Sequence, residues 1–241
     1  MKIRIYDNAE QAGSAAALLI AAQLIKKPDS VLGLATGSSP IPVYKQLIAL
    51  YKAGAVSFAK AVSYNLDEYV GLAPDHKCSY RRFMQEELFD HVDMRPEATH
   101  VPDGLAADPD AFAAEYDKAI RAAGGIDLQL LGIGRNGHIG FNEPNDHFVG
   151  GCHVVDLTES TIDANKRFFN SADEVPRQAL SLGISAILEA GTVVLIATGI
   201  DKAQAVRDAI RGDITPRVQA SILQSHRDVY WMLDKAAASL L

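Results

Sequence analysis

Cysteine is scarce in this chain of 241 residues, which contains only Cys78 and Cys152. The two cysteines belong to no Cys-x-x-Cys motif, which argues against a zinc knuckle or a redox dithiol and suits a reducing compartment. No apolar run approaches the ~18 residues of a membrane span. The N-terminus lacks the apolar core and cleavage site of a signal peptide. We therefore expect a cytoplasmic protein without a membrane segment.

Runs of positive charge are also missing. No run of Lys and Arg is longer than two residues, and the formal net charge is −7, so an extended nucleic-acid surface is not expected. An anionic ligand would have to be bound by a few local cations and backbone N–H groups. Apolar residues make up 48% and charged residues 22% of the chain, as in ordinary globular enzymes. The sequence contains no repeat, low-complexity segment or linker, which predicts one domain over residues 1–241.

Segments typical of strands and helices alternate along the whole chain. The expected strands are 3–6, 31–35, 61–66, 126–131, 154–156, 179–182, 192–197 and 228–233. The expected helices are 9–25, a segment from after 40 to 52, 79–89, 109–123, 159–169, 184–189, 202–210 and a short tail helix. This alternation predicts an α/β fold, a Rossmann-like three-layer sandwich with a mostly parallel central sheet. Ligands of such folds bind at the carboxyl ends of the strands, so polar residues that follow strands are the candidates.

The most informative of these segments is Leu131-Gly-Ile-Gly-Arg-Asn-Gly-His-Ile-Gly-Phe-Asn-Glu-Pro144, which directly follows an apolar strand. Its glycines allow sharp bends and a close approach of the backbone to a ligand. It also carries the polar side chains of Asn136, His138 and Glu143. A titratable pair on such a turn suggests an active site. A tight turn with incidental polar residues is the alternative.

Two other strand ends lead into helix starts that suit an anion. The first carries Thr36, Gly37, Ser38 and Ser39. The second carries Lys202, whose charge opposes the helix dipole unless an anion binds there. Arg167, next to two phenylalanines, is a candidate phosphate clamp. The alternatives are a serine N-cap, a solvated lysine and an arginine that covers an apolar helix face.

Asp67 follows the strand at 61–66, where a carboxylate in a pocket can act as a general base. A turn or N-cap aspartate is the alternative interpretation. The segment 221–226 either places His226 at the pocket rim or forms a simple turn. Taken together, these sites indicate a small phosphorylated metabolite and proton-transfer chemistry.

Five segments resemble the glucosamine-6-phosphate deaminase family, in order and over essentially the whole chain. They are Asn65-Leu-Asp-Glu-Tyr-Val-Gly-Leu72, the run 131–144, Asn165-Lys-Arg-Phe-Phe169, Thr198-Gly-Ile-Asp-Lys-Ala203 and Ser221-Ile-Leu-Gln-Ser-His226. The resemblance implies a hydrolase of amino-sugar catabolism that converts glucosamine 6-phosphate and water to fructose 6-phosphate and ammonia. It implies no metal and no organic cofactor.

The resemblance also implies roles for individual residues. Asp67 would carry the C2 proton to C1, and His138 would open the sugar ring. Glu143 would orient His138 and support its charge. The 6-phosphate would be held by Thr36, Gly37, Ser38, Ser39, Arg167 and Lys202.

Two features depart from parts of that family. Asn136 stands where many members carry Asp, and an amide can orient a neighbour but cannot ionise. The segment after Pro144 lacks the serines and basic residues of the family's allosteric site, and the chain ends without the C-terminal extension of the long forms. The resemblance therefore predicts a non-allosteric monomer that acts on a small molecule. The lack of basic runs and of long apolar runs predicts that this monomer binds neither nucleic acid nor membrane.

Two alternatives remain open on the sequence alone. A 6-phosphogluconolactonase would share the fold and the Gly-His core, but the segments 65–72 and 141–144 disfavour it. A sugar-phosphate-sensing domain without catalysis would need no Asp67, His138 and Glu143, and no N-terminal segment is left here for a DNA-binding helix-turn-helix.

Overall fold

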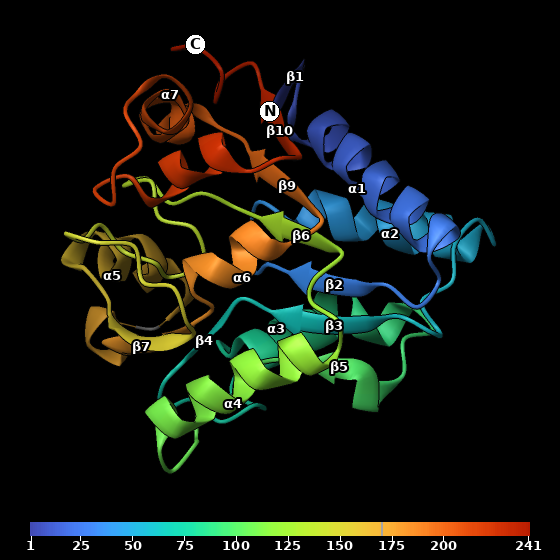
Figure 1. Cartoon of the computed structure of the whole chain (residues 1–241), viewed down its shortest axis with the longest axis horizontal. Coiled ribbons are helices and arrows are strands. Elements are labelled where there is room, and N and C mark those ends of the chain that lie inside the picture. Colours follow the sequence, from blue (N-terminus) through green and yellow to red (C-terminus); the bar gives the residue numbers. More distant parts are fainter. Residues whose placement is uncertain (170) are drawn as a thin grey trace.

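The computed structural model describes residues 1–169 and 171–241. Its centre is a seven-stranded sheet in which every pair of neighbouring strands is parallel. In spatial order the strands are β1 (Lys2–Tyr6), β10 (Val229–Asp234), β9 (Thr192–Ala197), β6 (Leu128–Leu131), β2 (Val31–Leu34), β3 (Val62–Asn65) and β5 (Thr99–His100). The predicted α/β class with a mostly parallel sheet is confirmed (Figure 1).

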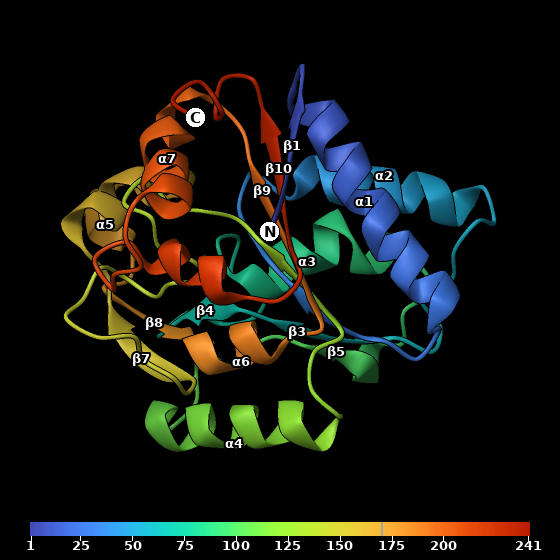
Figure 2. The same ribbon diagram turned by 45° about the horizontal axis from the view of Figure 1, so that its top comes forward.

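Helices cover the sheet on both faces, so the central strands are buried throughout. They are α1 (Ala9–Lys26), α2 (Ile41–Lys52), α3 (Tyr80–Glu87), α4 (Pro109–Ala122), α5 (Glu159–Asn165), α6 (Ile184–Glu189) and α7 (Ala203–Arg211). Figure 2 shows α1 and α2 together on one side of the sheet and α4 and α6 on the other. Burial on both faces explains why the last five residues of β9 are all apolar and buried.

The order of the strands reverses between β2 and β6. From β2 the chain moves outward through β3 to β5, and from β6 it moves the other way through β9 to β10. Adjacent strands β2 and β6 are paired at Leu32↔Leu128 and Gly33↔Gln129. Loops that leave such a pair diverge, which opens a crevice at their carboxyl ends. The segments that follow β2 and β6 are the Thr36–Ser39 loop and the glycine-rich run.

A second, antiparallel sheet of three strands lies beside the first, and the sequence did not predict it. It consists of β4 (Asp67–Tyr69), β8 (Gln178–Ser181) and β7 (His153–Asp156). The chain leaves the central sheet at Leu66, and Asp67 then pairs with Ser181. A small apolar cluster joins this sheet to α5, and it includes Tyr69, Phe141 and Ile162. Asp67 therefore follows the strand at 61–66, as expected, but it begins a further short strand and is not the turn or N-cap aspartate of the alternative interpretation.

Two expected helices differ from the structure. The helix expected over 159–169 is α5 followed by a 3-10 helix, η3 (Lys166–Phe168). The expected tail helix is wrong, because residues 235–240 form turns. Asp234 accepts a hydrogen bond from the Ala237 N–H at 2.7 Å, and so short a segment gains too few helical hydrogen bonds to offset nucleation. The other 3-10 helices are η1 (Phe89–His91), η2 (Pro96–Ala98), η4 (Ala172–Glu174), η5 (Ile200–Lys202) and η6 (Gln219–Ser225).

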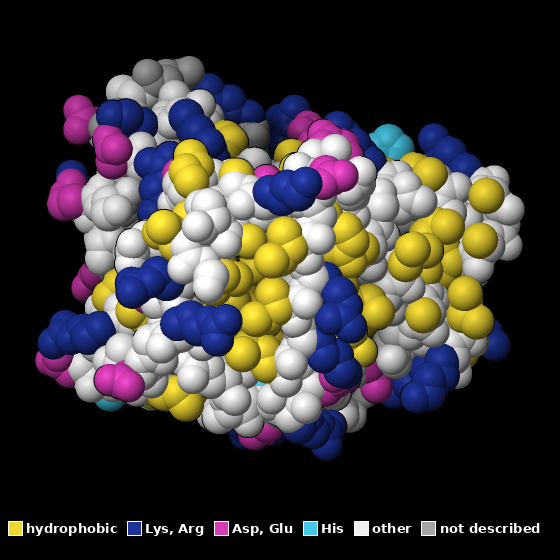
Figure 3. Space-filling view, turned by 90° about the horizontal axis from the view of Figure 1, so that it is seen from above, with side chains coloured by type: hydrophobic (Ala, Val, Ile, Leu, Met, Phe, Trp, Pro, Cys, Tyr) yellow, Lys and Arg dark blue, Asp and Glu magenta, His cyan; other side chains and the backbone are white. Residues whose placement is uncertain are grey.

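The surface gives no sign of an extended basic field on the face seen in Figure 3, where Lys and Arg side chains are scattered among apolar and acidic ones. Within the described ranges, no helix is both long enough and apolar enough to cross a bilayer.

Candidate active site

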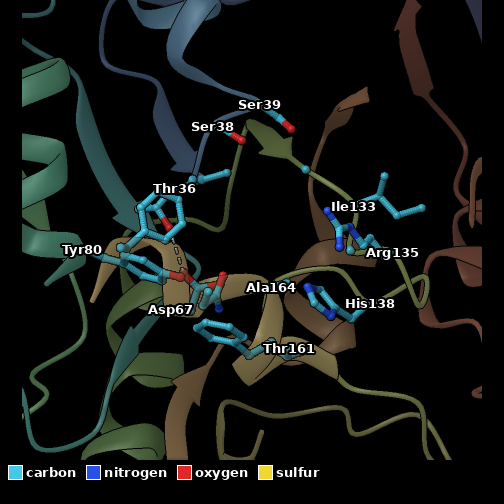
Figure 4. Close-up of a pocket in the computed structure, with 18 of the residues that line it drawn as sticks. Thr36, Ser38, Ser39, Asp67, Tyr80, Ile133, Arg135, His138, Thr161 and Ala164 are labelled. Atoms are coloured by element: carbon cyan, nitrogen blue, oxygen red, sulfur yellow. Dashed lines mark hydrogen bonds between the residues drawn. The ribbon is translucent and has the colours of Figure 1, made fainter. Parts of the chain in front are cut away.

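A cavity of about 380 Å³ opens at the carboxyl ends of β2, β6 and β9, in the crevice beside the reversal of strand order. This volume lies within the range of small-molecule sites. Its walls include nine of the ten residues singled out from the sequence: Thr36, Gly37, Ser38, Ser39, Asp67, Asn136, His138, Arg167 and Lys202. The tenth, Glu143, is buried and contacts the His138 ring. Figure 4 shows Asp67, Thr36 and Tyr80 on one side of the cavity and His138 and Arg135 on the other.

The loop after β2 forms one wall and leads into α2. Gly37 has φ +91°, a conformation that favours glycine, and a Cβ added there would meet open space. The N-cap of α2 is Pro40, and no described side chain caps the helix. The alternative of an ordinary serine N-cap is therefore wrong. Ser38 and Ser39 lie at the cavity instead, next to the uncapped helix start (Figure 4).

Arg167 and Lys202 reach the same region from different elements, and each is anchored. Arg167 Nη2 donates to Ser38 Oγ at 3.4 Å, and its guanidinium carbon lies 4.7 Å from the centre of the Phe168 ring. Lys202 Nζ donates to the Ile133 carbonyl at 2.8 Å. Burial lowers the pKa of Lys202 below its ordinary value. Anchored cations next to an uncapped helix start form a suitable site for a phosphate group.

Asp67 is only 6% exposed, yet its carboxylate lines the cavity. Thr36 Oγ1 donates a long hydrogen bond of 3.5 Å to Asp67 Oδ1 (Figure 4). Burial, with the nearby Glu68 charge as a second cause, raises the pKa of Asp67 to about 8. A carboxylate whose pKa lies near the working pH can both remove and return a proton.

The neighbouring carboxylate of Glu68 holds the start of α3 against β4. Its two oxygens accept hydrogen bonds from the backbone N–H groups of Tyr80 at 3.0 Å and Arg81 at 2.9 Å. Burial raises the pKa of Glu68 to about 7, although these hydrogen bonds oppose the rise. Tyr80 lines the cavity and stacks on Phe141, with ring centres 5.8 Å apart. Glu68 thus fixes the aromatic wall next to Asp67.

His138, Asn136 and Glu143 form a connected group on the opposite wall. His138 Nδ1 lies 3.4 Å from Glu143 Oε2. The same oxygen accepts a hydrogen bond of 2.7 Å from the Asn136 amide, whose own oxygen accepts the His138 backbone N–H at 3.2 Å. Burial by itself would raise the pKa of Glu143, but His138 and the surrounding hydrogen bonds lower it to about 2. Glu143 is therefore a permanent carboxylate beside the His138 ring.

The backbone of the glycine-rich run makes room for this imidazole. A Cβ added to Gly134 would lie 2.4 to 2.5 Å from the His138 ring atoms, so any larger residue there would displace the ring. Gly134 N–H also donates to the His138 carbonyl at 2.9 Å, which closes the turn. Close contact between the ring and the backbone thus explains the glycine at position 134.

Several residues of the site carried no recognisable signal in the sequence. Thr158, the N-cap of α5, holds Glu143 Oε1 through its hydroxyl at 3.2 Å. The only hint of this role was a threonine before a helix, which is common at N-caps. Other cavity residues that sequence reasoning missed are Tyr80, Arg135, Thr161 and Asp201.

One candidate from the sequence, His226, has a structural role. His226 is buried away from the cavity, with Nε2 2.9 Å from the Ala190 carbonyl and Nδ1 accepting the Asp228 N–H at 3.0 Å. Burial raises the pKa of the Cys152 thiol, which disfavours the reactive thiolate. Among the residues that the structure describes, no group of three or more His, Cys, Asp or Glu side chains is placed to hold a metal ion.

The fold and the cavity define a class of α/β protein whose site lies where the strand order reverses, between β2 and β6. One end of this site suits an anion, and its walls carry the titratable side chains of Asp67 and His138. A family model described as glucosamine-6-phosphate isomerases/6-phosphogluconolactonase matches residues 7–231. The chain belongs to this family.

Individual relatives distinguish the two branches of the family. A glucosamine-6-phosphate deaminase of Halothermothrix orenii is 50% identical over 241 residues, with all of both chains covered. A solved monomeric glucosamine-6-phosphate deaminase superposes with a TM-score of 0.98 at 43% identity, and all of both chains is covered. The 6-phosphogluconolactonase of Leishmania guyanensis has a TM-score of 0.73 at 22% identity over 98% of this chain and 97% of that one, and it shares the fold alone.

Proposed function

We propose that this protein is a glucosamine-6-phosphate deaminase, which converts glucosamine 6-phosphate and water to fructose 6-phosphate and ammonia. The observation that carries the proposal is the placement of two different proton-transfer groups on opposite walls of one cavity, with an anion-binding end beside them (Figure 4). Glucosamine-6-phosphate deaminases that are 49–50% identical to this chain over its whole length support the same activity. The lactonase structures share too little sequence to support the alternative.

The reaction begins with binding and ring opening. The 6-phosphate is held by the Thr36–Ser39 loop, Arg167 and Lys202, which fixes the sugar and lowers the entropic part of the barrier. His138 then takes the proton of the anomeric hydroxyl and returns a proton to the ring oxygen, which gives the open aldehyde. Glu143, ionised beside the ring, stabilises the imidazolium formed on the way.

Isomerisation and loss of the amine follow in the same cavity. Asp67 removes the C2 proton, and the electron pair left behind forms the C1=C2 double bond of an enolamine. The π bond of the C1 aldehyde breaks at the same time, and its oxygen takes up a proton from water. The proton on Asp67 is then delivered to C1, while C2 becomes an iminium carbon. Water adds to C2 and ammonia leaves, which yields the ketone of fructose 6-phosphate. The raised pKa of Asp67 suits it to carry the proton between the two carbons.

The direct test is to incubate the purified protein with glucosamine 6-phosphate and to measure ammonia and fructose 6-phosphate in parallel. Equal amounts of both products support the proposal. Release of 6-phosphogluconate from its lactone, without ammonia from the amino sugar, would establish the lactonase instead. Binding of the sugar phosphate without either product would establish a sensing domain.

We also propose that the protein is a single domain that acts as a non-allosteric monomer in the cytoplasm. The similarity to a solved monomeric deaminase over all of both chains supports the monomeric state. Light scattering is expected to give a mass near 25.9 kDa, and the rate is expected to depend hyperbolically on substrate concentration. A hexamer, or sigmoidal kinetics relieved by N-acetylglucosamine 6-phosphate, would contradict this part of the proposal.

The pH dependence of kcat/KM follows from the pKa of Asp67. Because the base must be ionised and its pKa is raised to about 8, kcat/KM is expected to rise about tenfold per pH unit below that value and to level off above it. Glu68→Gln removes a negative charge that raises this pKa, so the rising limb is expected to move to lower pH. A profile that is flat from pH 6 to 9 would show that Asp67 does not titrate in the rate-limiting step.

A further inference from the structure

A third cation lies at the phosphate end of the cavity. Arg135 belongs to the glycine-rich run, between Gly134 and Asn136, and its side chain lines the same cavity as Arg167 and Lys202. Figure 4 shows it beside Ile133, on the wall that also carries His138. The proposed reaction assigns it no role. The sequence carries no signal for it either, because a charged residue in an exposed turn is common.

The guanidinium of Arg135 is held in place by a carboxylate. Its Nε donates to Asp201 Oδ2 at 3.0 Å, and Asp201 lies in η5 and lines the cavity. This contact uses one edge of the guanidinium. Its two terminal nitrogens have no hydrogen-bond partner among the described residues. The Arg135 side chain is 54% and the Asp201 side chain 44% exposed, so the pair by itself adds little to stability.

The same arrangement recurs for all three cations of this region. Asp201 anchors Arg135, the Ser38 hydroxyl anchors Arg167, and the Ile133 carbonyl anchors Lys202. Each anchor holds a charged group near the cavity without using all of its donors. Burial is the largest cause of the lowered pKa of Lys202; Asp201 opposes it, and the nearby charges of Arg135 and Arg167 add to it. Three mutually repelling cations with free donors are stabilised when a dianion binds between them.

We propose that Arg135 is a further phosphate-binding residue of this site, and that Asp201 is the positioning residue that holds its guanidinium at the cavity. The inference rests on the proposed function, in which a sugar phosphate occupies this end. The terminal nitrogens of Arg135 bind the phosphate oxygens together with Arg167 and Lys202. Since the phosphate is unchanged during the reaction, Arg135 contributes to binding of the substrate and the transition state alike.

The test compares Arg135→Met with the wild-type protein in two measurements. In kinetics with glucosamine 6-phosphate, KM is expected to rise about tenfold or more while kcat stays within about twofold, because uniform binding is lost. In calorimetry, the Kd for inorganic phosphate is expected to rise by a similar factor. Arg135→Lys keeps the charge but not the fork of donors, so an intermediate loss is expected. Arg207→Met, an exposed arginine of α7 outside the cavity, serves as the matched control.

A double variant separates phosphate binding from simple neutralisation of Asp201. If Arg135 binds phosphate itself, Arg135→Met/Asp201→Asn stays as weak as Arg135→Met. If the double variant regains the wild-type KM and Kd, Arg135 only neutralises Asp201, and the proposal is overturned. It is also overturned if Arg135→Met leaves both constants unchanged, or if it lowers kcat without raising KM.

The calorimetric arm also keeps this inference separate from the proposed function. Binding of inorganic phosphate requires no turnover. A wild-type protein that binds phosphate through Arg135 but releases no ammonia from glucosamine 6-phosphate would disprove the deaminase while leaving the role of Arg135 intact. If the wild-type protein deaminates glucosamine 6-phosphate normally but the Kd for phosphate does not change in Arg135→Met, the role of Arg135 is disproved and the deaminase stands.

Discussion

Asp67→Asn is expected to lower kcat for glucosamine 6-phosphate by about 10³-fold or more, within the range of losses seen when a general base is removed. Asparagine has nearly the same shape as aspartate, and its carbonyl oxygen can still accept the hydrogen bond that Thr36 donates to Asp67. It cannot accept the C2 proton. Burial of an uncharged amide also removes the cost of a desolvated carboxylate, so the fold is expected to survive.

Binding measurements identify the cause of this loss. Fructose 6-phosphate is expected to bind Asp67→Asn with a Kd close to that of the wild-type protein, because Arg167 and Lys202 are untouched. Asp213→Asn, at an exposed carboxylate outside the cavity, is the matched control for the substitution itself. Near-normal turnover by Asp67→Asn would show that another group removes the C2 proton. Loss of fructose 6-phosphate binding together with turnover would point to damage of the cavity.

The position of Asp67 also shows how far the sequence alone specifies the fold. The apolar segments of the central sheet are buried on both faces, so their composition predicts them well. The second sheet is different, since β4 has three residues and pairs with β8 more than a hundred positions later in the chain. Local pattern contains no information about such a pairing. The sequence therefore predicted Asp67 at the correct edge of the central sheet, but it did not predict that Asp67 begins a strand of a second sheet.

Some site residues could likewise be predicted from local sequence, and others belong to the site only through contacts between distant segments. Asn136, His138 and Glu143 occupy one short run whose glycines are needed for close contact, so the motif and the geometry are local and both are visible in the sequence. Thr158 and Arg135 become part of the site only through contacts with Glu143 and Asp201 from distant segments. A threonine before a helix and an arginine in a turn are each common, and only the fold distinguishes them from ordinary surface residues.

His138→Gln is expected to lower kcat by about 10²-fold or more, because an amide cannot relay the proton from the anomeric hydroxyl to the ring oxygen. The variant keeps Asp67, so proton transfer from C2 is intact once the ring is open. Ring opening then becomes the slow step. The kinetic isotope effect on kcat with substrate deuterated at C2 is therefore expected to fall toward unity in His138→Gln.

Glu143→Gln tests whether the carboxylate acts through His138. The amide can still accept the Asn136 hydrogen bond made at 2.7 Å, but it removes the charge that lies 3.4 Å from His138 Nδ1. We expect a smaller loss of kcat, about tenfold or more, with the same decrease in the isotope effect. In the double variant His138→Gln/Glu143→Gln, the Glu143 substitution should add little to the loss of kcat from His138→Gln, because the effects of residues that act as a unit are not additive.

His147→Gln, at an exposed histidine of the following segment, is the control for both substitutions. An undiminished isotope effect in His138→Gln would place the histidine in C2 proton transfer rather than in ring opening, and additive losses would mean that Glu143 acts independently of it.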